Sequence, residues 1–379
     1  MSGIYIHIPF CKKACHYCNF HFSTQTKYLH EFTESLLKEI ELQHKYLNGK
    51  IETLYFGGGT PSLLSKDALR SIFSTIKNTF DLSHDLEFTL EANPDDLTAN
   101  QAQDWLELGI NRLSIGIQSF QPHSLAWMNR AHNVQQAHQA IANAKAAGFS
   151  NISADLIYGT PQLSDQDLAE DLQILLKYGI PHISCYALTV EEKTALHKMI
   201  QKKSLQDVDT AQQARQFELI VETLDNAGWE HYEISNFSKP NCRSKHNSNY
   251  WNGIPYLGLG PAAHSYNIHS RQWNIANNQL YFQSIKNNTV PFELETLETV
   301  TRFNEYMMIS LRQMEGFSLD KIKTQFGEKF EAHVKIIATN FELKQQVQKT
   351  AMGYCLTKEA KFFADGIASD FFWMEAKIN

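Results

Sequence analysis

The sequence contains no uninterrupted apolar run of the roughly 18–20 residues that a membrane-spanning helix needs. Its first ten residues show neither a basic segment nor a small-residue cleavage site, so we expect no signal peptide. The formal net charge is −7 and no stretch of Lys or Arg dominates. This composition argues against a protein that follows the phosphates of nucleic acids, and we expect no nucleic-acid partner.

Cysteine is scarce and unevenly distributed. The 379 residues include six cysteines, and half of them lie in one short segment, which is not the pattern of a disulfide framework. A reducing compartment is therefore indicated, and we expect a cytoplasmic protein.

The first half of the chain contains a regular alternation of strand-like and helix-like segments. The strand-like segments cover residues 3–10, 51–59, 85–94, 111–120, 151–159 and 182–190. Apolar residues recur every three or four positions over residues 29–47, 66–80, 98–109, 134–148 and 165–179. With right-handed crossovers, this alternation predicts an α/β fold in which a parallel sheet curls into a partial (β/α)6 barrel. The functional site of such a fold is expected at the carboxyl ends of its strands.

The alternation stops near residue 205. A helical pattern over 210–228 leads to an aromatic, Asn- and Gly-rich segment at 241–267. We therefore expect a core barrel over 1–205 and a connecting region over 206–289. A small, mostly helical C-terminal domain over 290–379 would follow, with a short apolar strand at 371–379.

Cys11, Cys15 and Cys18 lie within eight residues of one another, and Phe20 occupies the next likely ligand position. Buried structural cysteines would not be so concentrated. A structural zinc ion needs four ligands, so a nearby histidine or a distant cysteine would have to complete the set. An iron–sulfur cubane held by only three thiolates leaves one iron open to an exchangeable ligand. The spacing favours a reactive [4Fe–4S] cluster and leaves a zinc-stabilised binding protein as an alternative.

The segment CKKACHYC resembles the C-x3-C-x2-C pattern of radical S-adenosylmethionine (SAM) proteins. YIHIPFC, YFGGGTPS, EANPD, GIQSF…MNRAH and DLIYGTP are similar, in order, to strand-end motifs of the oxygen-independent coproporphyrinogen oxidase branch of that superfamily. The resemblance extends over at least residues 3–265. It implies a [4Fe–4S] cluster on Cys11, Cys15 and Cys18, with SAM on the open iron.

The same resemblance assigns the remaining strand-end residues to SAM binding. The implied contacts are Tyr5, Gly58, Gly59, Thr60, Glu91, Gln118, Arg130 and Asp155. Their chemistry suits the ligand, because carboxylates accept hydrogen bonds from hydroxyl and ammonium groups and a guanidinium binds a carboxylate. Taken singly, however, a glycine after a strand is more often an ordinary turn, and a strand-end carboxylate is more often a helix cap or an ion-pair partner.

Two features separate the chain from the decarboxylating oxidases, which carry a further cysteine where Phe20 stands and a longer extension before the cluster loop. Only ten residues precede Cys11 here. The segment HNSNYW, residues 246–251, also matches the H-N-x-x-Y-W signature of the HemW-type haem chaperones. That resemblance implies haem binding by His246, Asn247, Tyr250 and Trp251. Cys242 is the alternative axial ligand, and no C-x-x-C-H motif for covalent attachment occurs.

We therefore expect a haem chaperone that carries a [4Fe–4S] cluster and SAM, and binds haem non-covalently as cargo. It would deliver haem to acceptor haemoproteins, whether or not these are associated with a membrane. A homodimer is left open, as is turnover of SAM. The alternatives are an oxygen-independent coproporphyrinogen III oxidase and a zinc-stabilised binding protein.

Overall fold

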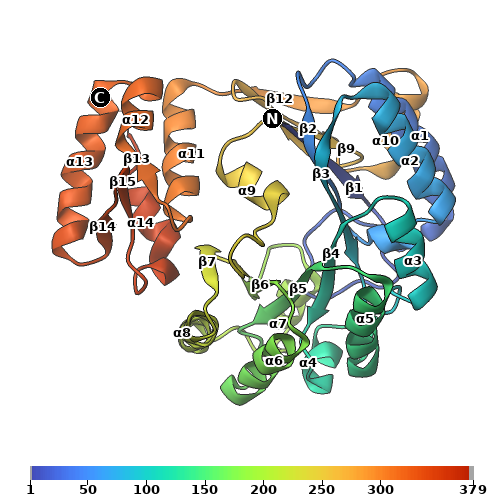
Figure 1. Ribbon diagram of the computed structural model, residues 1–379, viewed down its shortest axis with the longest axis horizontal. Helices are drawn as coiled ribbons and strands as arrows, with labels where there is room; N and C mark the ends of the chain where they lie inside the picture. Colours follow the sequence, from blue (N-terminus) through green and yellow to red (C-terminus); the bar gives the residue numbers. More distant parts are fainter. Residues whose placement is uncertain (1, 375–379) are drawn as a thin grey trace.

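The computed structural model describes residues 2–374 and contains the six expected parallel strands. These are β1 (Ser2–Ile8), β2 (Ile51–Gly58), β3 (Leu82–Ala92), β4 (Arg112–Gln118), β5 (Asn151–Tyr158) and β6 (His182–Ala187). Each pairs with the next in chain order, and all five pairings are parallel. The prediction of an α/β partial barrel is confirmed, because the sheet curves but ends in two open edges, β12 and β7 (Figure 1).

Five of the connecting helices are those that the periodicity predicts. They are α1 (Leu29–Leu42), α2 (Lys66–Thr79), α3 (Ala99–Glu107), α5 (Val134–Ala147) and α6 (Asp165–Tyr178). Figure 1 shows them on the outside of the curved sheet. α5 and α6 begin at side-chain caps, Asn133 and Ser164, and end at Gly148 and Gly179 in the left-handed conformation. The short helices α4 (Pro122–Trp127) and α7 (Ala195–Gln201) are additional.

Strand β1 illustrates how the sequence separates the two faces of the sheet. Ile4, Ile6 and Ile8 are fully buried in the main hydrophobic core under the helices. Because successive strand residues point to opposite faces, Tyr5 and His7 are directed into the barrel. Polar side chains at the alternate positions of β1 to β6 therefore gather inside the barrel.

The connecting region contains strands that the sequence pattern did not reveal. β7 (Glu230–Glu233) and β8 (Asn236–Ser238) extend the sheet beyond β6. At the other edge, β9 (Tyr256–Leu259) pairs in parallel with β1, and β10 (His264–Tyr266), β11 (Ser270–Asn274) and β12 (Phe292–Thr296) follow. The helices of this region are α8 (Thr210–Asn226), α9 (Lys245–Trp251) and α10 (Asn278–Lys286).

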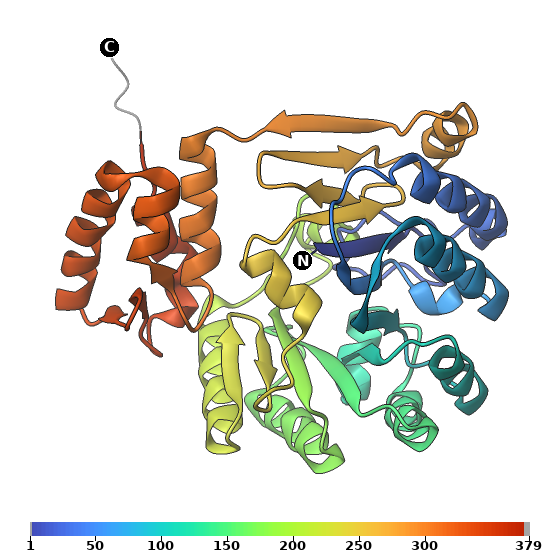
Figure 2. The ribbon, with the colours of Figure 1, turned by 45° about the horizontal axis from the view of Figure 1, so that its top comes forward.

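The last part of the described chain has its own hydrophobic core, centred on residues such as Phe303, Phe330 and Phe371. It comprises α11 (Thr299–Leu311), α12 (Leu319–Phe326), α13 (Glu328–Leu343), α14 (Ala364–Asp370) and a small sheet of β13 (Phe317–Ser318), β14 (Val347–Lys349) and β15 (Gly353–Leu356). Figure 2 shows this C-terminal region, orange to red, beside the large sheet. Strand β12 lies just beyond the predicted boundary at residue 290 but pairs with β11 in the large sheet. The predicted domain boundaries stay predictions.

The strand expected at 371–379 is wrong for residues 371–374, which lie in no strand, and the remaining five residues lie outside the described part of the chain. The reason is packing, because Phe371 is fully buried and stacks on Phe341 in the second core. Its apolar neighbours thus reflect burial and not strand formation. None of the helices within residues 2–374 combines the length and apolar character that crossing a bilayer demands.

Candidate functional site

The carboxyl ends of the parallel strands open into a cavity of about 380 Å3, which we call the strand-end cavity. Its walls include ten of the eleven residues assigned to the cluster and SAM: Cys11, Cys15, Cys18, Gly58, Gly59, Thr60, Glu91, Gln118, Arg130 and Asp155. The eleventh, Tyr5, lies behind this wall. Its ring stacks on Tyr55 at a centroid distance of 6.0 Å, and its hydroxyl lies 3.2 Å from Nδ1 of His7.

The cysteine loop is fixed to the segment that follows α4. The backbone N–H of His16 donates to the carbonyl of Met128, and the amide of Asn129 donates to the carbonyl of Ala14. Burial raises the pKa of the Cys11 thiol to about 11 and also raises the pKa of Cys18. Both thiols are therefore protonated at neutral pH, and a metal must displace those protons to bind.

The arrangement of the thiols fits a cluster better than a single ion. Within residues 2–374, no three His, Cys, Asp or Glu side chains are arranged to hold one metal ion. A cubane takes each thiolate on a different iron, so its ligands need not converge on one point, whereas zinc ligands must. His16 and His21 each direct one ring nitrogen elsewhere, to the carbonyl of Trp127 and to Asn278.

Arg130 places a buried guanidinium beside the cysteine loop. One terminal nitrogen lies 3.3 Å from the sulfur of Cys15 and 3.2 Å from the hydroxyl of Tyr17. The other donates to Asn93 Oδ1 at 2.8 Å and to the carbonyl of Gly116 at 2.9 Å. Its Nε is buried and has no hydrogen-bond partner among residues 2–374. Because an unpaired buried donor is costly, this atom is suited to an anionic group of a ligand.

Gln118 provides an unpaired acceptor in the same cavity. Its Oε1 is buried without a hydrogen-bond partner, and its backbone has a φ of +65°, which is uncommon for a residue other than glycine. An unpaired donor on Arg130 and an unpaired acceptor on Gln118 match the carboxylate and ammonium of an amino acid. The cavity therefore fits the amino-acid end of SAM on the chemistry of its own residues.

Two carboxylates complete the strand-end cavity. Glu91 accepts hydrogen bonds from the Tyr55 hydroxyl at 2.7 Å and from the backbone N–H of Gly58 at 3.2 Å. Burial raises the pKa of Glu91 to about 7 and also raises the pKa of Asp155, which accepts a bond from Ser114. Hydroxyl or ammonium groups of a ligand would stabilise both carboxylates in the charged form.

The glycines are required by the chain itself. A Cβ on Gly59 would lie 2.6 Å from the carbonyl oxygen of Phe10, and one on Gly58, whose φ is +101°, would lie 2.5 Å from the ring of His7. Close packing against β1 and Phe10 is therefore enough to require glycine at positions 58 and 59, whether or not a ligand approaches them.

The HNSNYW segment lies in α9 and does not line the strand-end cavity. His246 is 2% exposed, and its Nδ1 lies 2.7 Å from Thr53 Oγ1, near the start of β2. Its Nε2 lies 2.9 Å from the hydroxyl of Tyr250, and its ring stacks on Tyr55 at 4.9 Å. Burial lowers the pKa of His246 to about 3. Both ring nitrogens are engaged, so coordination of iron by His246 would require a rearrangement of α9.

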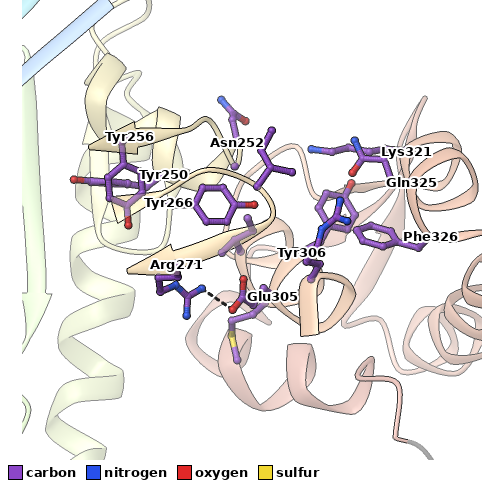
Figure 3. Close-up of a pocket in the computed structure, with 15 residues that line it drawn as sticks. Tyr250, Asn252, Tyr256, Tyr266, Arg271, Glu305, Tyr306, Lys321, Gln325 and Phe326 are labelled. Carbon is purple, nitrogen blue, oxygen red and sulfur yellow. Dashed lines mark hydrogen bonds and ion pairs between the residues drawn. The ribbon is translucent and has the colours of Figure 1, made fainter. Parts of the chain in front are cut away.

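The four predicted haem residues do not converge on one surface. Asn247 donates to the hydroxyl of Tyr232, and the guanidinium of Arg312 lies over the ring of Trp251. Among the four, Tyr250 alone lines a second cavity, of about 480 Å3, between the sheet and the C-terminal region. We call it the interdomain cavity (Figure 3). Sequence reasoning missed it because its lining residues are far apart in the chain and share no motif.

Comparison with known proteins gives the class and then the family. Residues 5–175 match the family model described as "Radical SAM superfamily", the class that the sheet and strand-end cavity define. "Heme chaperone HemW" of Bacillus subtilis is 32% identical over 375 residues, covering 98% of this chain and 99% of that protein. The Mycobacterium tuberculosis (strain ATCC 25618 / H37Rv) protein of the same name is 34% identical over 87% of this chain and 86% of its own length. This chain belongs to the HemW family of radical SAM proteins, and membership implies a [4Fe–4S] cluster and SAM.

Among solved structures, coproporphyrinogen III oxidase (HemN) from Escherichia coli is similar with a TM-score of 0.84. The identity is 19%, and the match covers 98% of this chain and 90% of that chain. At this level of identity the similarity establishes the shared fold alone.

Proposed function

We propose that this protein is a haem chaperone, which binds haem non-covalently and delivers it to acceptor haemoproteins in the cytoplasm or at its membrane. The observation that carries the proposal is the match with relatives named haem chaperone over nearly the whole of both chains. The HNSNYW segment, which lies beside a cavity large enough for a ligand, supports it.

In this proposal the strand-end cavity holds the resident cofactors. Cys11, Cys15 and Cys18 bind three irons of the [4Fe–4S] cluster, and SAM occupies the fourth. Arg130 and Gln118 receive the carboxylate and ammonium of SAM, for which each has an unpaired buried atom. Glu91 and Asp155 receive its hydroxyl groups, and Gly58, Gly59 and Thr60 shape the wall beside them. A cluster of this kind supplies electrons to SAM when both are bound.

Phe20 favours the chaperone over the oxidase. Its side chain is 61% exposed and lines the strand-end cavity at the position where the oxidases carry a further cysteine. A phenyl ring supplies neither a metal ligand nor a proton, so that contribution to chemistry is missing here. We also include a homodimer in the proposal, and its test is the oligomeric state in solution.

The deciding experiment is anaerobic reconstitution of the full chain with iron and sulfide, followed by two parallel assays. Haem titration followed in the Soret region should saturate at one haem per chain as the simplest case. Incubation with coproporphyrinogen III, SAM and a reductant should yield no decarboxylation. Rapid decarboxylation without saturable haem binding would replace the chaperone with the oxidase, and light scattering on the same samples gives the oligomeric state.

A further inference from the structure

The interdomain cavity has aromatic walls on both sides. On the sheet side, the Tyr250 and Tyr256 rings are 4.6 Å apart, and Tyr266 follows 6.3 Å beyond Tyr256. On the C-terminal side, the rings of Tyr306 and Phe326 lie 5.8 Å apart. Figure 3 shows the two groups facing each other across the cavity. Aromatic faces on opposite walls suit a flat, largely apolar ring system, and the volume lies within the usual range for ligand pockets.

The same cavity contains positive charge that no carboxylate of the described residues pairs with. Arg271 of β11 forms an ion pair with Glu305 of α11 at 2.5 Å, across the cavity. Within residues 2–374, neither Arg302 nor Lys321 forms an ion pair; Arg302 lies over the Phe326 ring and Lys321 over the ring of Tyr306. Burial lowers the pKa of Lys321, and an anion beside it would oppose that effect. Two half-buried cations without counter-charges therefore remain.

We infer that the interdomain cavity binds a tetrapyrrole through its ring and its carboxylates. Arg302 and Lys321 each take one propionate, and Tyr250 packs against the ring. The inference rests on the proposed function, since it names the place where the haem cargo is held. A planar dicarboxylate is the ligand class that aromatic walls and two unpaired cations select.

This geometry gives His246 a positioning role. It lies outside the cavity, behind Tyr250, and bonds the hydroxyl of that residue at 2.9 Å. If His246 is the iron ligand, as the sequence-based assignment has it, the main contact between protein and haem is with the metal. If haem lies in the interdomain cavity, the main contacts are with the porphyrin ring and the propionate carboxylates. The two assignments differ in whether iron is required for binding.

The first test changes the ligand and leaves the protein unaltered. Reconstituted full-length protein is titrated with haem, with iron-free protoporphyrin IX and with protoporphyrin IX dimethyl ester, followed by quenching of tryptophan fluorescence. We expect haem and iron-free protoporphyrin IX to bind within threefold of each other, and the ester at least tenfold more weakly. Equal binding of the ester and the free acid would overturn the role of the cations.

The second test removes the two charges by the double change Arg302→Gln and Lys321→Gln. The matched control is Lys329→Gln with Lys344→Gln, because these cations also lie over aromatic rings of the C-terminal region but do not line the cavity. The Kd for haem should rise at least tenfold in the first variant and less than twofold in the control. Iron content, SAM affinity and thermal midpoint should match wild type in both.

The outcomes separate the two levels of the proposal. Wild-type haem affinity in the Arg302/Lys321 variant would overturn the cavity assignment and leave the chaperone function standing. Haem binding more than tenfold tighter than that of iron-free porphyrin, and lost in His246→Ala, would move the main contact to His246. No saturable haem binding by wild type would contradict the proposed function itself.

Discussion

The strand-end cavity and the interdomain cavity differ in what holds their walls. The first is built on the ends of adjacent strands of one sheet, which share a single hydrophobic core. The second lies between that sheet and a region with a separate core. Walls on one rigid element suit groups that stay bound, whereas walls on two cores can separate with less disruption of packing. The difference matches the proposed division of roles, with resident cofactors in the strand-end cavity and a cargo that leaves in the interdomain cavity.

The two cavities also differ in charge. Glu91 and Asp155 give the strand-end cavity buried carboxylates beside Arg130, whose two terminal nitrogens already have partners within the protein. In the interdomain cavity Glu305 is paired, and the unpaired charges are the cations Arg302 and Lys321. The strand-end cavity thus offers acceptors for hydroxyl and ammonium groups and one guanidinium for a carboxylate, whereas the interdomain cavity offers two cations for carboxylates. Removing groups from one cavity should leave ligand binding at the other nearly unchanged.

The largest effect is expected for Cys15→Ala. A cubane cannot be held stably by two thiolates, so iron content and absorption near 400 nm (about where thiolate-ligated cubanes absorb) should fall to background after anaerobic reconstitution. Haem affinity should stay close to wild type because the cargo binds in the other cavity. Cys242→Ala is the control and should retain its iron and an unaltered haem spectrum. Close to four irons per chain in Cys15→Ala would contradict the cluster assignment.

A smaller effect is expected for Arg130→Ala. Loss of a charge-assisted hydrogen bond to the SAM carboxylate should weaken binding by roughly 1.5–3 kcal/mol, measured by calorimetry under anaerobic conditions. Iron content is measured on the same samples, because Arg130 also contacts the sulfur of Cys15. Exposed Arg70→Ala serves as the control. A variant with full iron and unaltered SAM affinity would show that the guanidinium has another role.

The next effect concerns pH and Glu91. Below pH about 4.5 this carboxyl is protonated in folded and unfolded chains alike, whereas the folded-state pKa is about 7 because of burial. Raising the pH from about 5 to 8 therefore charges a group that the folded protein disfavours, and its contribution to stability falls. The stability of Glu91→Gln relative to wild type should therefore rise between pH 5 and pH 8 by on the order of 1 kcal/mol, since water in the cavity reduces the penalty.

Urea unfolding of the cofactor-free protein at both pH values measures this difference. Other buried groups titrate in the same range, including Glu39, whose pKa burial raises to about 7. The comparison between Glu91→Gln and wild type cancels their contribution. A difference in stability that is the same at pH 5 and pH 8 would contradict the raised pKa of Glu91.

The smallest effect is expected for Arg271→Met, which removes the ion pair across the interdomain cavity. Both partners are about one third exposed, so the loss in free energy of unfolding should be no more than about 1 kcal/mol. Haem should nevertheless dissociate faster in stopped-flow transfer to apomyoglobin, because the pair links the two walls. We choose Met because replacing Arg by Met loses less side-chain volume than replacing it by Ala. An unchanged dissociation rate would show that the walls are held together by other contacts.

The sequence predicted the six parallel strands because each is apolar on one face and five of them are followed by an amphipathic helix, of which α2, α3, α5 and α6 begin at side-chain caps. It did not predict β7 to β12, since strands of three to five residues carry too little alternation. The pairing of Gly3 with Tyr256 is also invisible to any local pattern. A similar reason explains the mistaken strand at 371–379, where Phe371 is apolar because it fills a core.

The candidate site divides in the same way. Residues of the strand-end cavity could be found because strand ends meet in space wherever a parallel sheet forms, so ordered motifs such as EANPD and DLIYGTP converge without further information. Arg302 and Lys321 could not, because a single cation on a helix is ordinarily solvated. Their significance depends on the tyrosines of distant strands. The engagement of Nδ1 of His246 likewise depends on Thr53, which lies nearly two hundred residues away in the sequence.

The parallel pairing of β1 with β9 also sets the order in which the molecule can be completed during synthesis. The chain makes β1 and the cysteine loop first, but the edge of β1 finds its partner only when Tyr256–Leu259 has left the ribosome. At about 5–20 residues per second, this interval lasts on the order of ten to fifty seconds. Contacts so far apart in sequence also form slowly. Until α9 and β9 have been made, neither can pack against β1 and β2, so the polar interior of the barrel stays open to solvent in a nascent chain.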